Sequence, residues 1–224
     1  MKSISLLCRV AVLLALAIIP CQASIIFTAG GGGTGNNVLL QCPPGDLECL
    51  AENADNDSRL FGTVQNTLFQ TQFDANVNIM PGASGQATIV PALAGDAWTL
   101  LDLSWINFAS TDEVILRVKP LEDDTTVVLS ATDQFGNTFT SAPNFAGVPA
   151  PQGQFFTLTT ADGQLITSVR VASDKSLVEV EQVRLGNLNG GGGEVPEPGT
   201  LSLLGAGLLF AGVIWRRRQI RRDL

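Results

Sequence analysis

The chain has 224 residues, of which 21 are acidic and 13 basic, and it contains neither histidine nor tyrosine. The lack of histidine excludes a Ser-His-Asp triad, a Cys-His nucleophile and a histidine-ligated zinc site. Glycoside hydrolysis by two carboxylates stays open, although no pair of acidic residues stands out from the pattern. We therefore expect no enzymatic activity and no cofactor.

The first 23 residues are predicted to be a secretory signal peptide. A basic start precedes an uninterrupted apolar run at 10–19, which Pro20 ends. The small residues after Pro20 are of the kind that a signal peptidase reads, so we expect cleavage between Ala23 and Ser24. Cys21 makes a lipoprotein signal the alternative, but Pro20 stands where that pattern has a small residue.

Because the chain is expected to be exported, we count the charge of the exported part, residues 24–194, separately. Residues 24–194 hold six basic and nineteen acidic residues, a formal charge of −13, because seven of the thirteen basic residues lie in the two ends. Such a charge keeps a domain soluble and disfavours nucleic acid or an anionic membrane as a partner. Residues 36–186 are enough for one domain with its own core.

The exported part begins with glycine and a cysteine pair. Residues 24–35 are glycine-rich and are predicted to form a flexible lead-in, which is followed by a short strand at 37–41. No Lys-Ser/Thr pair and no helix follows these glycines, so they are not a phosphate-binding loop. Cys42 and Cys49 are the two cysteines left after signal removal, in an oxidising compartment, and we expect a disulfide between them. Metal binding by two lone thiols is a poor alternative.

Residues 48–59 are polar and are expected to form a loop or one helical turn. Asp55, Asn56 and Asp57 can supply oxygen ligands to calcium, but the glycine and the closing glutamate of an EF-hand loop are absent. A solvated loop is the main interpretation, structural calcium is the alternative, and no other metal is expected.

From residue 61 onward, short segments rich in β-branched and aromatic residues alternate with turn signals. Polar and apolar residues alternate within 101–105, 113–119 and 178–181, which places one face of each strand in a core and the other in water. This pattern indicates an all-β antiparallel β-sandwich of jelly-roll type. The expected strands are 62–79 (one bent strand or two), 87–91, 98–108, 113–120, 125–132, 154–160, 164–173 and 176–185.

Three segments follow the predicted sandwich in a fixed order. A glycine-rich linker at 187–194 leads to the extended segment Val195-Pro196-Glu197-Pro198, in which both prolines disfavour helix. An apolar segment at 199–215 is expected to be a single transmembrane helix. Its uncharged part, 201–215, would rise roughly 22 Å as a helix. This is short of the roughly 30 Å hydrocarbon core unless flanking residues extend it or the bilayer thins.

An arginine cluster at 216–222 closes the chain and favours a cytoplasmic C-terminus. The membrane-orienting residues are Arg216, Arg217, Arg218, Arg221 and Arg222.

The order of these segments over 195–222 resembles the PEP-CTERM sorting signal of exported Gram-negative bacterial proteins. The resemblance covers about the last thirty residues. It implies that an exosortase, a membrane transpeptidase-like protein with a cysteine nucleophile, reads the Pro-Glu-Pro segment. It also implies a precursor anchored in the inner membrane and then delivered to the cell surface or extracellular matrix. An ordinary single-span anchor is the alternative, but such an anchor needs no Pro-Glu-Pro and usually runs about 20 residues.

Residues 127–185 carry a second resemblance. The runs 130–139, 154–158 and 180–186 are similar to a domain that recurs in PEP-CTERM proteins. The resemblance implies a galactose-binding-like sandwich, and most such domains lack an assigned activity. The resemblance therefore implies a fold and no reaction.

Two hypotheses of different classes follow for the exported domain. The first is a non-enzymatic protein of the cell surface or matrix, and the second is a carbohydrate- or exopolysaccharide-binding module. Sugar binding usually uses exposed aromatic rings. Trp98, at a strand start, and Phe135, in a turn, are the candidate sugar contacts. Trp105 lies in phase with Leu101 and Leu103 and is expected in the core.

Overall fold

The structure, a computed structural model of the whole chain, describes residues 24–31, 35–42, 47–54, 57–67, 69–82, 87–106, 110–142, 144–161 and 163–189. The signal peptide predicted at 1–23 and the sorting signal predicted at 195–222 lie outside these residues. Within the described ranges, no helix is long and apolar enough to cross a membrane.

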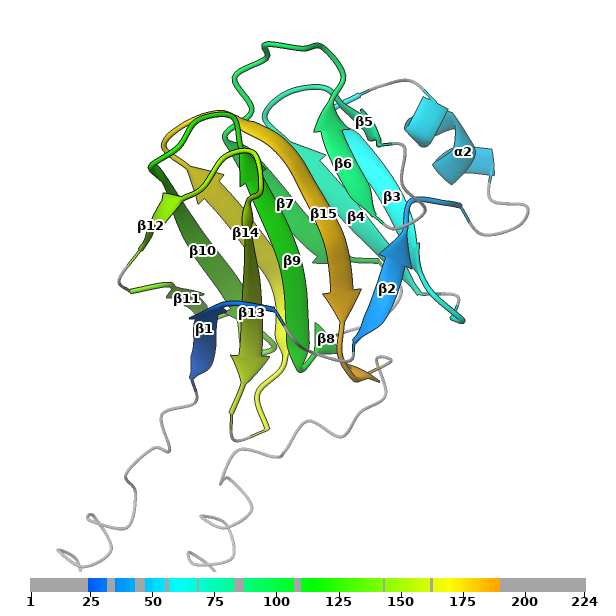
Figure 1. Cartoon of the computed structure of the whole chain (residues 1–224). Helices are drawn as coiled ribbons and strands as arrows, with labels where there is room; N and C mark the ends of the chain where they lie inside the picture. Colours follow the sequence, from blue (N-terminus) through cyan, green and yellow to red (C-terminus); the bar gives the residue numbers. More distant parts are fainter. Residues whose placement is uncertain are drawn as a thin grey trace, which may run out of the picture. The chain divides into compact units, whose positions relative to one another are not determined.

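In the described part of the chain, sixteen antiparallel strands form one hydrogen-bonded sheet that folds into two facing layers (Figure 1). Layer A contains β1 (Ile25–Ala29), β5 (Ile79–Pro81), β6 (Thr88–Pro91), β9 (Glu113–Pro120), β13 (Gln154–Thr160) and β15 (Leu177–Leu185). Layer B contains β3 (Arg59–Val64), β4 (Gln70–Ala75), β7 (Leu100–Trp105), β8 (Ser110–Thr111), β10 (Thr125–Asp133), β11 (Thr138–Thr140), β12 (Phe145–Val148), β14 (Ile166–Ser173) and β16 (Leu188–Asn189).

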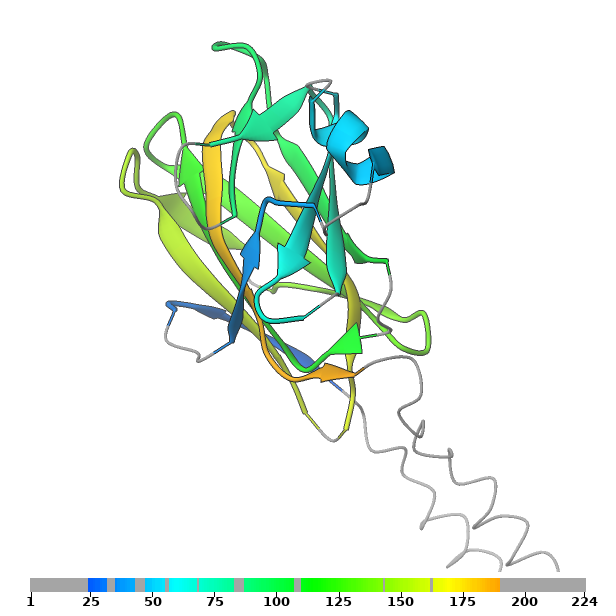
Figure 2. The same ribbon diagram turned by 90° about the vertical axis from the view of Figure 1, so that its right-hand side faces the viewer.

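The two layers are joined along one edge by β2 (Asn36–Leu39), which pairs with β15 of layer A and with β3 of layer B. Figure 2 looks onto this edge, with the helix α2 near the viewer. The all-β antiparallel architecture predicted from the sequence is therefore confirmed. The narrower jelly-roll or galactose-binding-like type stays a prediction.

The core lies between the layers and is built from alternate residues of the strands. Leu101 and Leu103 of β7 and Leu116 and Val118 of β9 are fully buried, as their period of two predicts. Trp105 is partly buried and packs against this core, and its indole Nε1 donates to the carbonyl oxygen of Ile166 at 2.9 Å.

The alternation predicted for 178–181 is wrong. Val178 is 39% exposed, whereas Glu181 is only 8% exposed and Val180 is fully buried. The pairing of β15 with β9 shifts register twice along this strand, and Gln182 has a φ of 54°. Bulges of this kind exchange inward and outward positions, and the amino-acid pattern does not reveal them.

Basic residues of β9 surround the carboxylate of Glu181. Arg117 Nη1 lies 2.8 Å from Glu181 Oε1, and Lys119 Nζ lies 3.0 Å from Oε2 and 2.9 Å from Glu179 Oε2. Burial disfavours the charged form of Glu181, but the hydrogen bond from Lys119 and the nearby positive charges outweigh it and lower the pKa of Glu181. Burial likewise opposes the charge of Lys119, yet its bonds to both glutamates raise the pKa of the lysine.

The lowered pKa of Glu181 predicts a pH-dependent contribution to stability. It is present above the pKa of the unfolded chain and is lost as pH falls through the lower folded-state pKa. We expect Glu181→Gln to lower the free energy of unfolding by about 1–3 kcal/mol at neutral pH, because Arg117 and Lys119 lose their charged partner. Urea unfolding of both proteins should show this difference shrinking as pH falls below the ordinary value of 4.5.

The control for this prediction is Glu122→Gln. The Glu122 carboxylate is 66% exposed and lies 3.7 Å from Lys175, so its loss should change the free energy of unfolding by less than about 1 kcal/mol. A Glu181→Gln effect that is the same in acid and at neutral pH would contradict the ion-pair account.

The segment 24–35 is not a flexible lead-in throughout, so that prediction is corrected. β1 pairs with β13 along its whole length, and Ile25 is buried. A Cβ atom on Gly31 would lie 2.7 Å from the ring of Phe155. Glycine at this position therefore allows the backbone to approach layer A closely, where a larger residue would collide.

The predicted disulfide between Cys42 and Cys49 is confirmed. Cys49 lies in α2 (Leu47–Ala54), which is longer than the single turn expected in this region. Asn53 of α2 donates from Nδ2 to the carbonyl oxygen of Phe61 at 3.0 Å and accepts from the backbone N–H of Phe61 at 2.7 Å. The Asn53 amide thereby hydrogen-bonds to the part of the β3 edge that β2 does not cover. This part of the edge is then not open to pairing with another strand.

We predict that the disulfide stabilises the domain mainly by restricting the unfolded chain. The two cysteines are 7 residues apart, so replacing both by serine should cost about 2–3 kcal/mol of unfolding free energy. Thiol labelling of the denatured protein checks the bond itself and should find no free thiol before reduction. Asn53→Ala is the companion variant, since it removes the contacts to Phe61 and keeps the bond. Two reactive thiols in freshly exported protein would refute the prediction.

Candidate functional site

Most of the residues assigned to export and sorting lie outside the described part of the chain. These are Ala23, Val195, Pro196, Glu197, Pro198 and the five arginines of 216–222. Ser24 is described, and its carbonyl oxygen accepts a hydrogen bond from the N–H of Ala161 at 3.2 Å. The cleavage site and the roles of the sorting residues stay predictions.

The assignment of Trp98 as a sugar contact is corrected. Its side chain is fully buried, and its indole Nε1 donates to the carbonyl oxygen of Leu100 at 2.9 Å. The strand β7 begins two residues later, at Leu100, so Trp98 belongs to the preceding loop, which turns inward. Phe135 is 52% exposed, in agreement with its predicted place in a turn, and its contact with sugar stays a prediction.

The turn that presents Phe135 is organised by the buried carboxylate of Asp133. Oδ1 accepts from the backbone N–H groups of Phe135 at 2.9 Å and Asn137 at 2.8 Å. Oδ2 accepts from the side-chain amides of Asn137 at 2.9 Å and Gln164 at 3.0 Å. Gly136 has a φ of 82°, which glycine adopts without strain. These four hydrogen bonds to one carboxylate fix the conformation of the turn that carries the exposed Phe135 ring.

We predict that Asp133→Ala lowers the free energy of unfolding by about 2–4 kcal/mol, because four donors lose their acceptor in a buried place. Asp133→Asn should cost less, since the amide keeps one acceptor oxygen. Phe135→Ala is the control and should change stability by no more than about 0.5 kcal/mol, since the ring is exposed. Chemical denaturation measures all three variants. If Asp133→Ala leaves the free energy of unfolding unchanged, the carboxylate does not stabilise the turn.

The loop considered for calcium is described only in part. Asp55 and Asn56 lie outside the described residues, and Asp57 is exposed. In the described segments, no group of three or more His, Cys, Asp or Glu side chains is placed to hold a metal ion. Structural calcium at this loop stays a prediction.

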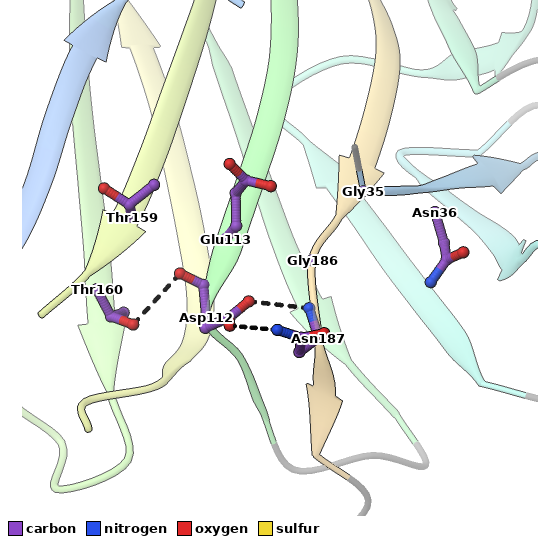
Figure 3. A pocket seen from close by; sticks show the side chains of 8 residues that line it. All are labelled: Gly35, Asn36, Asp112, Glu113, Thr159, Thr160, Gly186 and Asn187. Carbon is purple, nitrogen blue, oxygen red and sulfur yellow. Dashed lines mark hydrogen bonds between the residues drawn. The ribbon is translucent and has the colours of Figure 1, made fainter. Parts of the chain in front are cut away.

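A depression of about 340 Å³ lies where the ends of β13 and β15 meet the start of β9 (Figure 3). Asp112 Oδ1 accepts from the backbone N–H of Asn187 at 2.9 Å, and Oδ2 accepts from its side-chain amide at 2.8 Å. Thr160 donates its N–H to the carbonyl oxygen of Asp112 at 3.0 Å. Asp112 thus joins three chain segments, because its carboxylate binds Asn187 and its backbone carbonyl binds Thr160.

These contacts also correct the boundary of the predicted linker, 187–194. Leu188 and Asn189 form β16 and pair with β8, so the domain continues past residue 186. The glycine-rich remainder, 190–194, lies outside the described residues.

A second depression, of about 420 Å³, lies on the outer face of layer B. Alternate residues of neighbouring strands face outward there, and the strand register aligns them in two rows. The first row is Arg59, Asp74, Asp102, Arg170, Ser130 and Thr140. The second row is Phe61, Gln72, Ser104, Ser168, Thr132 and Thr138.

We call the depression the polar groove and define it by its eight polar lining residues. They are Asp74, Asp102, Ser104, Ser130, Thr132, Thr138, Ser168 and Arg170. The sequence contains the alternation that turns these side chains outward. It does not say which strands are neighbours, and for that reason sequence reasoning missed the site.

A bidentate ion pair lies in the polar groove. Arg170 donates from Nε to Asp102 Oδ1 at 2.7 Å and from Nη2 to Oδ2 at 2.9 Å. These hydrogen bonds and the carboxylate charge raise the pKa of Arg170 against the opposing effect of burial. The side chains nevertheless stay accessible, at 57% for Arg170 and 34% for Asp102. Asp74 forms a second ion pair in the groove, through a contact of 2.9 Å between its Oδ1 and Arg59 Nε.

Hydroxyl groups form the rest of the polar groove. Ser130 Oγ lies 3.1 Å from Thr140 Oγ1, and Thr132 Oγ1 lies 3.4 Å from Thr138 Oγ1. Ser104 and Ser168 are opposite one another on β7 and β14. The groove can therefore donate and accept hydrogen bonds over a surface that spans the five neighbouring strands β4, β7, β14, β10 and β11.

The fold and these surfaces define a two-layer antiparallel β protein with a polar outer face. Comparison with known families identifies its sorting signal: residues 194–218 match the model of the PEP-CTERM protein-sorting motif. The chain therefore carries this motif, as its Pro-Glu-Pro segment, apolar segment and arginines predict. The motif implies an exported, membrane-anchored precursor that an exosortase processes for the cell surface. Comparison with curated proteins and with solved structures gave no match.

Proposed function

We propose that the chain is an exported, non-enzymatic protein of the cell surface or extracellular matrix of a Gram-negative bacterium. It is delivered there after a signal peptidase cleaves at Ala23–Ser24 and an exosortase reads Val195–Pro198. The observation that carries the proposal is the match of residues 194–218 to the PEP-CTERM sorting motif.

The proposed recognition follows from the order of the segments. The apolar segment 199–215 places the sorting segment next to the membrane, and the arginines of 216–222 keep the far end on the cytoplasmic side. The prolines favour an extended Pro-Glu-Pro, which a membrane enzyme can bind without first unfolding it. The glycines of 190–193 give that enzyme access past the folded domain.

The proposal that the domain is not an enzyme is supported by its composition and by the two depressions described above. The chain has no histidine to act as a general base. Asp112 is engaged by Asn187, and Asp102 is engaged by Arg170. Both carboxylates therefore already accept two hydrogen bonds from protein groups and position those groups.

Binding of exopolysaccharide is the second candidate function. The polar groove favours it, because hydroxyl, carboxylate and guanidinium groups are accessible together on rigid strands. Nucleic acid is not expected as a partner, since the exported part carries a net charge of −13.

The sorting proposal predicts different outcomes for two sets of variants. Replacing Pro196, Glu197 and Pro198 by alanine should leave membrane insertion intact, because none lies in the apolar segment. It should abolish processing, so that the full-length form accumulates in the inner membrane. Membrane fractionation with antibody detection and mass spectrometry of the mature ends measures both effects.

The comparison set replaces the five arginines by glutamine. These variants should lose retention and orientation while keeping the segment that the enzyme reads. Normal processing and delivery of the triple-alanine protein would reduce the C-terminal segment to a plain anchor and defeat the proposal.

A further inference from the structure

The chemistry of the polar groove matches that of a sugar. Each sugar hydroxyl both donates and accepts a hydrogen bond, so a sugar-binding surface needs donors and acceptors side by side. The Asp102 carboxylate and the Arg170 guanidinium provide both within one bidentate pair, at 2.7 and 2.9 Å. Planar groups of this kind match two neighbouring hydroxyls at once.

The pair keeps capacity for a ligand. An arginine has five N–H donors, and two of those on Arg170 bond to Asp102. Among the described residues, the other three donors have no partner. The Arg170 side chain is 57% exposed, so a ligand can reach them. Because Asp102 already balances the charge, binding leaves no charged group unpaired.

The charge balance of this face favours an uncharged ligand. Asp74 and Asp102 are matched by Arg59 and Arg170, each pair lying within 2.9 Å. The exported part around this neutral face carries a formal charge of −13, which repels polyanions.

The hydroxyl side chains extend the surface beyond the ion pair. Ser104 and Ser168 face each other across β7 and β14, and Thr132 and Thr138 follow on β10 and β11. All of them lie on paired strands, so the surface is ordered before a ligand arrives. The depression of about 420 Å³ falls within the usual range of roughly 300–1,000 Å³ for ligand sites.

We infer that the polar groove binds an uncharged polysaccharide, with the Asp102–Arg170 pair as its central contact. This inference rests on the proposed function, because the export of the protein brings it into contact with extracellular polysaccharide. Binding through hydrogen bonds on an open surface is weak for one site, and it gains strength when several copies engage one long polymer.

The test uses the full chain purified in a mild detergent, with affinity electrophoresis through gels that contain dextran, a galactan, a mannan or polygalacturonate. We expect retardation by at least one of the three neutral polymers, with little change when salt is added. Thr138→Arg should reduce this binding about tenfold or more, because its side chain fills the groove. Thr28→Arg should bind like wild type. Thr28 is also an exposed threonine on an outer strand, but in layer A.

A second variant tests the contribution of the ion pair to binding without filling the groove. Arg170→Lys keeps the charge and removes the planar fork, so binding should fall about tenfold. Circular dichroism melting compares the folding of every variant with wild type. The inference is overturned if no neutral polymer binds, if polygalacturonate alone binds in a salt-sensitive manner, or if folded Thr138→Arg and Arg170→Lys bind like wild type.

The binding test is independent of sorting. The triple-alanine variant of the Pro-Glu-Pro segment should bind the neutral polymer like wild type, even though its processing fails. A failed sorting proposal and a failed binding inference therefore give different results.

Discussion

Burial of one face of every strand is the constraint on which the rest of this structure depends. Fully buried residues such as Leu103 and Leu116 fill the space between the layers, and their outward neighbours must then face water. The strand register aligns these outward-facing residues of adjacent strands in rows across the layer. Asp102 and Arg170 meet because Leu103 and Val171 on either side of them are held inside. The polar groove is thus a direct consequence of core packing.

Local pattern predicted much of the fold. The strands predicted at 113–120 and 154–160 have the observed bounds, and the turn at Phe135 and the Cys42–Cys49 bond also agree with the prediction. The missed features depend on distant partners. Thr157 donates to the carbonyl oxygen of Gly30 across a separation of 127 residues. No periodicity in the first glycines indicates that they pack on a strand so far along the chain.

The candidate site was predicted less well, for the same reason. Asp102 and Arg170 are 68 residues apart, and their pairing follows from the order of the strands. Trp98 precedes the alternating segment, so its burial depends on the path of a loop. Bulges add a further limit, since the φ of 54° at Gln182 reverses the faces of β15 without an unusual residue to mark it. Residue types thus give the chemistry of the surface, and tertiary pairing decides where it gathers.

The short strand β16 has a mechanical consequence. It pairs with β8 through only two residues, and Asn187 just before it is held by Asp112. A tension applied to the chain beyond residue 189 meets these few bonds first and can peel them one after another. The longer pairing of β15 with β9 lies behind these bonds in the chain, so it is reached only after they have opened. The end of the domain can thus open at β16 and Asn187 before the core between the layers is strained.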